Sequence, residues 1–293
     1  MLFIWHTIAT VLPTVKMYFL VVLGFTIVEF FIPAERGQPL RNQFSNFQYV
    51  LVYYFVTPFA MILPTALLTA IARTIGPGFI RLDLEHIRVG IATLHWPVRN
   101  LLLPFIPLIV YDFFYYWHHR LQHTLPTFWA IHRLHHSVES LNALAANSVH
   151  WLEEPMRVFT MALPMAILFN FTEVQGAWIA FGLAQIGVFI HSNLRIHLGP
   201  ITPVFVGPQL HRLHHSTEPK HHDHNFSAIF PIWDILFGTY YKPMPDEWPA
   251  TGLGAGDHAA SSPHEFVYPF RAWGRAIANW FTFGNKRVER TIP

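Results

Sequence analysis

The sequence contains no cysteine among its 293 residues. This absence excludes a disulfide framework, a thiolate zinc site, an iron–sulfur cluster and a cysteine nucleophile. Charged residues are also scarce, at 12% of the chain, compared with about 25% in an average soluble protein. The formal net charge of only +2 excludes a nucleic-acid-binding protein that relies on a basic patch. This composition indicates a chain whose main partner is lipid.

Hydrophobic residues make up 52% of the chain and gather in long runs. A membrane-spanning helix needs about 20 mostly apolar residues. Five runs approach this length: residues 15–32, 47–71, 101–117, 156–169 and 177–190. Pro58 and Pro64 are expected to bend the second run, and the mixed charged and apolar residues of 73–99 favour a helix at the membrane interface. The sequence therefore predicts an all-α, polytopic membrane protein with four to five transmembrane helices.

Histidine is the unusually frequent residue type. The chain has 20 histidines, against 19 lysines and arginines together, and 15 of them lie between His118 and His224. The hexapeptide HRLHHS occurs twice, at residues 132–137 and 211–216. Helix residues at i, i+3 and i+4 share one face, so each repeat can present three imidazoles together. Upstream, HHRLQH places His119 and His123 one turn apart, whereas His118 points about 100° away.

Eight histidines at these spacings predict a site for two divalent metal ions: His119, His123, His132, His135, His136, His211, His214 and His215. A single catalytic zinc ion usually has about three protein ligands, so it would leave most of this set unused. The two apolar runs between the repeats are expected to form a hairpin, which returns the second repeat to the same side of the membrane. Imidazole binds iron, copper, nickel and zinc, so the ligand type alone does not identify the metal.

Other interpretations of the histidines stay open at this point. A His-rich membrane metal-transport or metal-binding protein would place its ligands inside spans or in low-complexity loops, and a bis-histidine haem protein needs only two axial ligands. A metal-dependent membrane hydrolase is a further alternative. The roles of five other histidines are undecided: His118, His197, His221, His222 and His224.

The order HRLQH, HRLHHS and a second HRLHHS, followed by WDILFGTY, resembles the fatty acid hydroxylase/sterol desaturase superfamily of integral-membrane, non-haem di-iron enzymes. The family pattern H-x3-H, H-x2-HH and H-x2-HH maps onto the eight histidines, and the similarity extends over residues 112–241. The resemblance adds two metal ligands, His191 and, in HWLEEP, His150. Carboxylates near the motifs are expected to accept hydrogen bonds from the ligating histidines: Asp112, Glu154, Asp223 and Asp234.

The resemblance implies O2-dependent hydroxylation or desaturation of an aliphatic C–H position of a membrane lipid, such as a sterol or a fatty acyl chain, at two iron ions. The sequence has no Rossmann, flavin or haem-binding motif, so we expect a separate electron donor of the cytochrome b5, ferredoxin or reductase type. Arginines and lysines lie near the histidine motifs and not in the turn NFTEVQ, which favours a cytoplasmic histidine-rich helical cap.

The compact size, without a fused cytochrome domain, favours a bacterial inner membrane over the endoplasmic reticulum. We expect one integral-membrane domain over residues 1–293. Within it, residues 1–111 are expected to hold the first spans and the interfacial helix, residues 112–241 the catalytic region, and residues 242–293 a peripheral tail.

Overall fold

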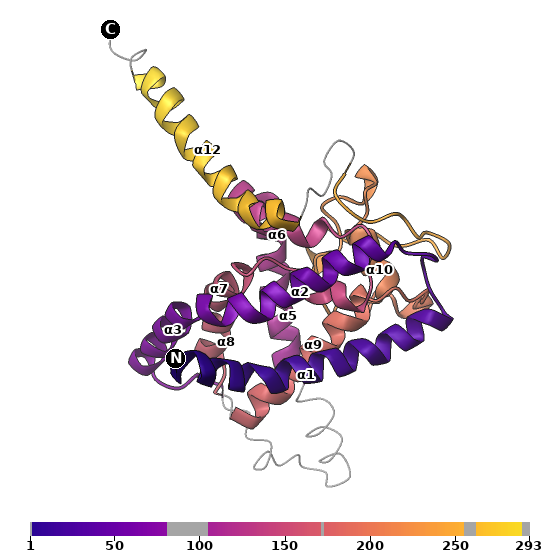
Figure 1. Cartoon of the computed structure of the whole chain (residues 1–293), viewed down its shortest axis with the longest axis horizontal. Coiled ribbons are helices and arrows are strands. Elements are labelled where there is room, and N and C mark those ends of the chain that lie inside the picture. Colours follow the sequence, from indigo (N-terminus) through magenta and orange to yellow (C-terminus); the bar gives the residue numbers. More distant parts are fainter. Residues whose placement is uncertain (1, 81–104, 171–172, 255–261, 289–293) are drawn as a thin grey trace.

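The computed structural model describes residues 2–80, 105–170, 173–254 and 262–288 and is built from helices (Figure 1). Over these residues there is no β-strand, and only isolated bridges form, such as that between Pro33 and Leu194. The expected all-α class is therefore confirmed. The interfacial helix expected within 73–99 falls largely outside the described residues.

Three helices form the N-terminal part: α1 (Leu2–Phe31), α2 (Leu40–Ala60) and α3 (Ile62–Ile75). The helices α2 and α3 meet at an angle of 48°, with Pro58 and Pro64 on either side of the break. Each proline removes a backbone donor, so the helical hydrogen bonding is interrupted where the sequence predicted a bend. Among the described residues, one helix is long and apolar enough to cross a membrane, over Leu12–Phe31, or two if the bent pair is one span. The count of four to five spans stays a prediction.

The first two histidine motifs lie on consecutive helices, α5 (Phe105–Thr124) and α6 (Pro126–His136). The apolar run of α5 continues without a break through HHRLQH, so one helix carries both the apolar residues and the first ligand candidates. Only Leu125 separates the two helices, and Pro126 starts α6 at a position where its missing N–H costs nothing. The tight corner brings the end of α5 against α6. A short 3₁₀ helix, η2 (Ala143–Asn147), follows.

The expected hairpin is formed by a bent helical segment and the helix α9 (Glu173–His191). The bent segment consists of α7 (Glu153–Arg157), the π-helix η3 (Val158–Ala162) and α8 (Leu163–Leu168). Four short helices follow: η4 (Gly199–Ile201), α10 (Pro208–His214), η5 (Pro219–His221) and α11 (Ile232–Leu236). The second HRLHHS lies on α10, which packs against α9.

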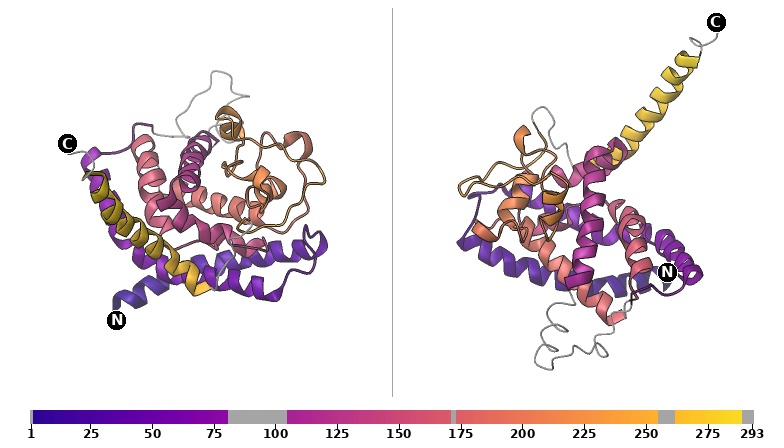
Figure 2. Two further views of the ribbon diagram at one scale, coloured as in Figure 1. Left: turned by 90° about the horizontal axis from the view of Figure 1, so that it is seen from above. Right: turned by 180° about the vertical axis from the view of Figure 1, so that it is seen from behind.

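A long C-terminal helix, α12 (Ser262–Val288), extends away from the rest of the molecule (Figures 1 and 2). Its first turns pack on α6, where Glu265 forms a buried ion pair with Arg133. The Arg133 guanidinium carbon also lies 4.4 Å from the ring centre of Tyr268, and the Trp273 indole N–H donates to the Thr127 carbonyl at 3.0 Å. The C-terminal segment is thus anchored to the helix that carries the first HRLHHS.

A buried carboxylate of α1 joins the N-terminal helices to the histidine region. Glu29 accepts hydrogen bonds from the backbone N–H groups of Ala143 and Asn193, at 2.8 and 2.7 Å. Nearby, Glu35 accepts a charged hydrogen bond at 3.0 Å from Arg212 of the second HRLHHS. Backbone donors that would otherwise be buried without partners are satisfied in this way, and the ends of η2 and α9 are held against α1.

Candidate metal centre

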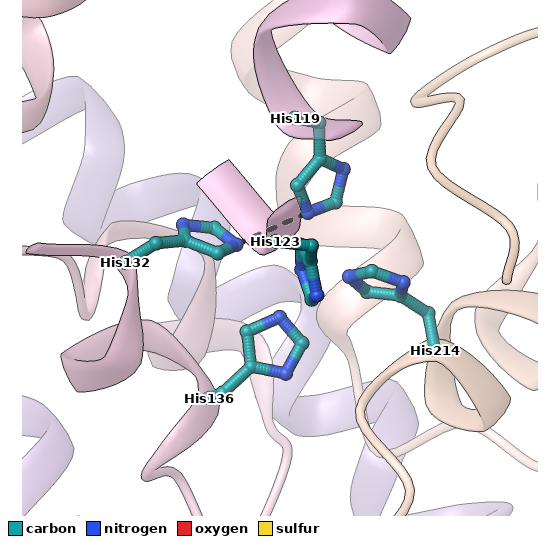
Figure 3. A group of neighbouring side chains, drawn as sticks. All are labelled: His119, His123, His132, His136 and His214. Atoms are coloured by element: carbon teal, nitrogen blue, oxygen red, sulfur yellow. Dashed lines mark hydrogen bonds between the residues drawn. The ribbon is translucent and has the colours of Figure 1, made fainter. Parts of the chain in front are cut away.

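The structure gathers nine histidines into two groups, whose ligand nitrogens lie within 4.8 Å of one another inside each group. The first group, shown in Figure 3, consists of His119, His123, His132, His136 and His214. The second group consists of His135, His191, His211 and His215. All eight histidines of the three motifs are included, together with His191 from the end of α9. Their role as metal ligands stays a prediction.

The two groups do not correspond to the two HRLHHS repeats. The first repeat contributes His132 and His136 to the first group and His135 to the second. The second repeat contributes His214 to the first group and the remaining two histidines to the second. The three imidazoles of a repeat therefore share a helix face, as their spacing predicts, but they are divided between two adjoining sites.

Within each group the Nε2 atoms approach one another closely. In the first group, the Nε2 atoms of His119 and His132 lie 3.1 Å apart. In the second group, the Nε2 atom of His191 lies 3.0 Å from that of His135 and 2.8 Å from that of His211. Neutral imidazoles gain little from pointing their acceptor nitrogens at one another, whereas a shared cation makes such convergence favourable.

The opposite ring nitrogens of several of these histidines face fixed hydrogen-bond partners. The Nδ1 atom of His132 lies 3.0 Å from the Glu153 carboxylate, and that of His119 lies 2.7 Å from the Phe226 carbonyl. Backbone carbonyls face three more Nδ1 atoms, in the pairs His135 with Ser148, His191 with Gly187 and His214 with His224. An N–H donated from Nδ1 leaves the Nε2 lone pair free to bind a metal.

Three Nε2 atoms of the first group, those of His123, His136 and His214, are buried without a hydrogen-bond partner among the described residues. Buried polar atoms are nearly always paired, because an unpaired one costs free energy. All three point toward the centre of the group in Figure 3. The imidazole donor set and these unpaired nitrogens fit a bound metal ion of the imidazole-preferring kind.

Burial favours the neutral form of several motif histidines. It lowers the pKa of His136, His211 and His215 well below the ordinary value, and the neighbouring imidazoles lower these pKa values further. Burial also lowers the pKa of His214 to about 3. A neutral imidazole retains the lone pair that binds a metal, so these side chains are in the ligating form at neutral pH.

A cavity of about 260 Å³ opens beside the first group. His123, His136 and His214 form one wall, and Trp129, Asp223 and Leu253 lie among the other lining residues. The second group does not line this cavity. The first group is therefore the one that a small molecule reaches directly from this side.

The structure does not bring His150 to either group. Its Nε2 atom lies 3.1 Å from the Phe266 carbonyl of α12, and its Nδ1 atom accepts the backbone N–H of Leu152 at 3.1 Å. With both ring nitrogens occupied in this way, His150 connects α12 to the loop before α7. The structure therefore gives His150 no place in either group, and its role as a metal ligand stays a prediction.

Five other histidines, whose roles the sequence left open, also lie outside the two groups. His118 faces Thr160, His197 faces Gln209, and His221 lies between Ser216 and Glu247. His222 lines the cavity beside the first group, and His224 supplies the carbonyl that faces His214.

Three of the four carboxylates that were expected to accept hydrogen bonds from ligating histidines contact other groups instead. Asp112 accepts backbone N–H groups from Ala228, Ile229 and Phe230, and Asp234 accepts those of Phe226 and Ser227. Both therefore hold the loop after the second repeat.

Only Asp223, 3.8 Å from His123, approaches a grouped histidine as expected. Glu154 instead pairs with Arg157 and Tyr53.

The carboxylate that does contact a grouped histidine is Glu153, which the sequence analysis missed. It is fully buried and lies between His132 and Arg157. Burial acts to raise the pKa of Glu153, but His132 and Arg157 outweigh this effect and hold the pKa well below its ordinary value. The pair Glu153–Glu154 in HWLEEP was the available signal, and only the orientation of α7 distinguishes its two members.

Comparison with known proteins identifies the region that contains these groups. Residues 104–239 match the fatty acid hydroxylase family model. This region belongs to the fatty acid hydroxylase family. The resemblance indicated by the motifs is therefore confirmed. No solved structure matches the chain.

Several curated proteins are similar to this chain. Ornithine lipid hydroxylase OlsE of Rhizobium tropici is 29% identical over 180 residues, which are 61% of this chain and 53% of the relative. An alkylglycerol monooxygenase of Danio rerio is 35% identical over 129 residues, 44% of this chain and 28% of the relative. Methylsterol monooxygenase 1 of Gallus gallus is 27% identical over 133 residues, 45% of this chain and 43% of the relative. The matches thus span about half of these relatives or less.

Proposed function

We propose that this protein is a membrane-bound oxygenase that hydroxylates or desaturates an aliphatic C–H position of a membrane lipid at an all-histidine di-iron centre. The observation that carries the proposal is the pair of adjoining histidine groups, with nine imidazoles and no carboxylate among their members. Such a donor set suits two metal ions of the imidazole-preferring kind. The names of the relatives, a lipid hydroxylase and two monooxygenases, favour a reaction with O2 over the other reactions, and iron is the metal that the resemblance of the motifs implies.

Each group would hold one ion, the first through five histidines and the second through four. When bound, the iron pair supplies the activation of O2 that attack on an unactivated C–H bond requires. The chain itself fixes the ligands: the Glu153 carboxylate accepts the Nδ1–H of His132, and the Phe226 carbonyl accepts that of His119. These contacts set the tautomer and the ring orientation. Burial of the site limits the access of water to the reaction.

The reaction needs electrons from a separate protein, for which a cytochrome b5-, ferredoxin- or reductase-type donor is the class we propose. In a hydroxylation, one oxygen atom of O2 enters the C–H bond and the other leaves as water, with two electrons and two protons taken up. In a desaturation, the lipid loses two hydrogens and both oxygen atoms leave as water, again with two electrons from the donor and two protons taken up. Sterol, fatty acyl and related lipids are all candidate substrates.

The membrane arrangement that accompanies this function has four to five spans, with both histidine groups in a cytoplasmic cap. Residues 1–111 would form the first spans, residues 112–241 the catalytic region and residues 242–293 a peripheral tail, in a bacterial inner membrane. The absence of cysteine allows a simple test. Single cysteines at the exposed positions Glu139 and Glu218, just after each repeat, should both label from the cytoplasmic side. Labelling from opposite sides would contradict a cap on one face of the membrane.

The decisive experiment combines metal analysis with O2 consumption. Purified protein loaded with iron should hold two ions per chain and consume O2 only when both a lipid extract and a reduced donor are supplied. Mass spectrometry of the lipid should show a product that has gained one oxygen atom or lost two hydrogens. A lipid product without O2 consumption would instead indicate a metal-dependent hydrolase. Metal uptake into vesicles without any lipid product would indicate a metal-transport protein.

A further inference from the structure

A second cavity, of about 340 Å³, lies between the α2–α3 junction at Met61, α5, α7, the π-helix, α8 and α9, and it is partly open to the surface. Its volume falls in the range of about 300–1,000 Å³ that is usual for small-molecule sites. Most of its wall is apolar, with Val158, Met161, Met165 and Leu183 among the lining residues. An open, mostly apolar cavity between such helices is suited to an aliphatic chain.

One wall of this cavity is the π-helix Val158–Ala162. A π-helical turn is rare, is less favourable than an α-helical turn, and often occurs at functional sites. Here it separates α7, which carries the charged end of the cavity, from α8, which carries part of the apolar wall. The unusual turn therefore lies where a ligand would contact the protein.

The polar end of the cavity is formed by Glu154 and Arg157. Hydrogen bonds through Glu153 link this end to the first histidine group. The Arg157 guanidinium donates to Glu154 at 2.7 Å and to Glu153 at 3.2 Å. The second oxygen of Glu153 lies 3.0 Å from Nδ1 of His132. The cavity thus ends two hydrogen bonds away from a candidate metal ligand.

One donor at this end has no partner. The Nε atom of Arg157 is buried, and the described residues offer it no acceptor. Its two other nitrogens are held by glutamates, so the guanidinium is fixed in place. A buried N–H without a partner costs free energy that an acceptor oxygen of a ligand would recover. The single cation is already balanced by two carboxylates, so no surplus positive charge is available for a phosphate monoester.

We propose that this cavity binds the substrate lipid, with one aliphatic chain against the apolar wall and a headgroup oxygen accepting the Nε–H of Arg157. The lipid carries no net negative charge, and its first oxygen is a hydroxyl, ether or ester oxygen. That the bound lipid is the substrate rests on the proposed function. The lipid enters through the open side of the cavity without crossing water.

The site is tested by photolabelling of the full-length protein in nanodiscs with a monoacylglycerol that carries a diazirine in mid-chain. We expect crosslinks on Met161, Met165 or Leu183, and displacement of the label by unlabelled monoacylglycerol. A lysophosphatidic acid probe with the same chain should label weakly. Crosslinks confined to other segments, or equal labelling by the phosphate monoester, would overturn the proposal.

Two variants on the same helix supply a matched comparison. Ala180 lines the cavity and Ala184 is exposed one turn further along α9 without lining it. Ala180→Trp should remove most of the labelling, whereas Ala184→Trp should retain it. Should Ala180→Trp fail to accumulate, Ala162→Phe on the π-helix fills the same cavity. Equal labelling in the filled and unfilled variants would exclude this cavity as the lipid site.

The role of Arg157 is tested by Arg157→Lys, which keeps a cation near both glutamates and removes the Nε–H. Loss of one hydrogen bond should weaken monoacylglycerol binding by about tenfold. Labelling by a diazirine alkane, which has no headgroup oxygen, should be unchanged, and a parallel loss for both probes would contradict the assigned hydrogen bond. Labelling of the cavity without lipid-dependent O2 consumption would remove the proposed function and leave the lipid site standing. O2 consumption with labelling elsewhere would leave the proposed function standing and remove the lipid site.

Discussion

The two HRLHHS repeats have identical sequences, yet they contribute to the two histidine groups in opposite ways. On α6, the first and last histidines of the triplet join the first group, and the middle one, His135, joins the second. In the second repeat, at the end of α10, the first and last join the second group, and the middle one, His214, joins the first. Each group therefore depends on both helices. Both copies of the repeated sequence thus supply histidines to both groups.

The surroundings of the two repeats differ more than their sequences. The arginine of the first repeat, Arg133, forms an ion pair with Glu265 in which both side chains are buried. The arginine of the second repeat, Arg212, pairs with Glu35, whose side chain is 33% exposed. The first repeat also has a carboxylate, Glu153, on one of its histidines, whereas no carboxylate among the described residues contacts a histidine of the second. Identical ligands are thus supported by different neighbours.

Double variants should show most clearly whether each metal ion belongs to one histidine group or to one HRLHHS repeat. His136→Ala with His214→Ala removes two ligands of the first group only, so about one of two iron ions per chain should remain. His135→Ala with His136→Ala removes one ligand from each group within a single repeat, so both ions should be lost or greatly weakened. Both double variants should lose turnover. Metal analysis distinguishes them, and His258→Ala, an isolated histidine in the sequence, should keep both ions. The opposite pattern of retention would assign one ion to each repeat.

The Glu153→Gln variant should distinguish the first group, in which a carboxylate contacts His132, from the second group. Loss of a carboxylate that orients a ligating histidine typically weakens metal binding or activity by about 10–100-fold. We expect the ion of the first group to be removed by a chelator before that of the second. Glu139→Gln, at an exposed carboxylate, serves as the control. Unchanged chelation of both ions would show that Glu153 has no influence on the metal.

The sequence was sufficient to predict structural features that depend on residues close together in the chain. The apolar run 15–32 falls within α1 except for its last residue, and the prolines at positions 58 and 64 lie on either side of the bend between α2 and α3. The histidine spacings indicated which side chains share a helix face. These features depend on residues a few positions apart, so composition and periodicity are enough to predict them.

The remaining features depend on how helices are oriented against one another. The division of each repeat between two groups depends on how the two repeats are placed in space, which spacing does not contain. Glu153 and Glu154 are adjacent, and only the rotation of α7 turns Glu153 toward His132. The ion pair between Arg133 and Glu265 joins residues 132 positions apart. No local pattern predicts a contact at that separation.

The ion pairs of the two repeats should differ in their contribution to stability. Removing one partner of a buried pair costs about 3–5 kcal/mol, because the other charge is left without compensation. Arg133→Met should therefore lower the temperature of thermal unfolding strongly, and the double variant with Glu265→Leu should recover much of the loss. Arg212→Met should have a smaller effect, since water can reach Glu35. An equal decrease in both variants would remove this distinction.

The smallest expected effect concerns the loop after the second repeat, which surface ion pairs hold. Glu247 accepts from Lys220 at 2.7 Å and faces His221 at 2.9 Å. Partial burial acts to raise the pKa of Glu247, but hydrogen bonds from Lys220, Met244, His221 and Tyr241 outweigh it and lower the pKa to about 2.

A carboxylate with a lowered pKa stabilises the folded state fully above its unfolded pKa, near 4.5, and this contribution is lost as the pH falls toward about 2. Because Lys220 is fully exposed, water and salt screen the pair and its contribution to stability is small. Glu247→Gln should thus slightly lower thermal stability at pH 7 and flatten its decline between about pH 5 and pH 3. Melting curves of the two proteins over this range measure the difference. If the thermal stability of wild type and of Glu247→Gln declined equally as the pH fell, Glu247 would not hold this loop.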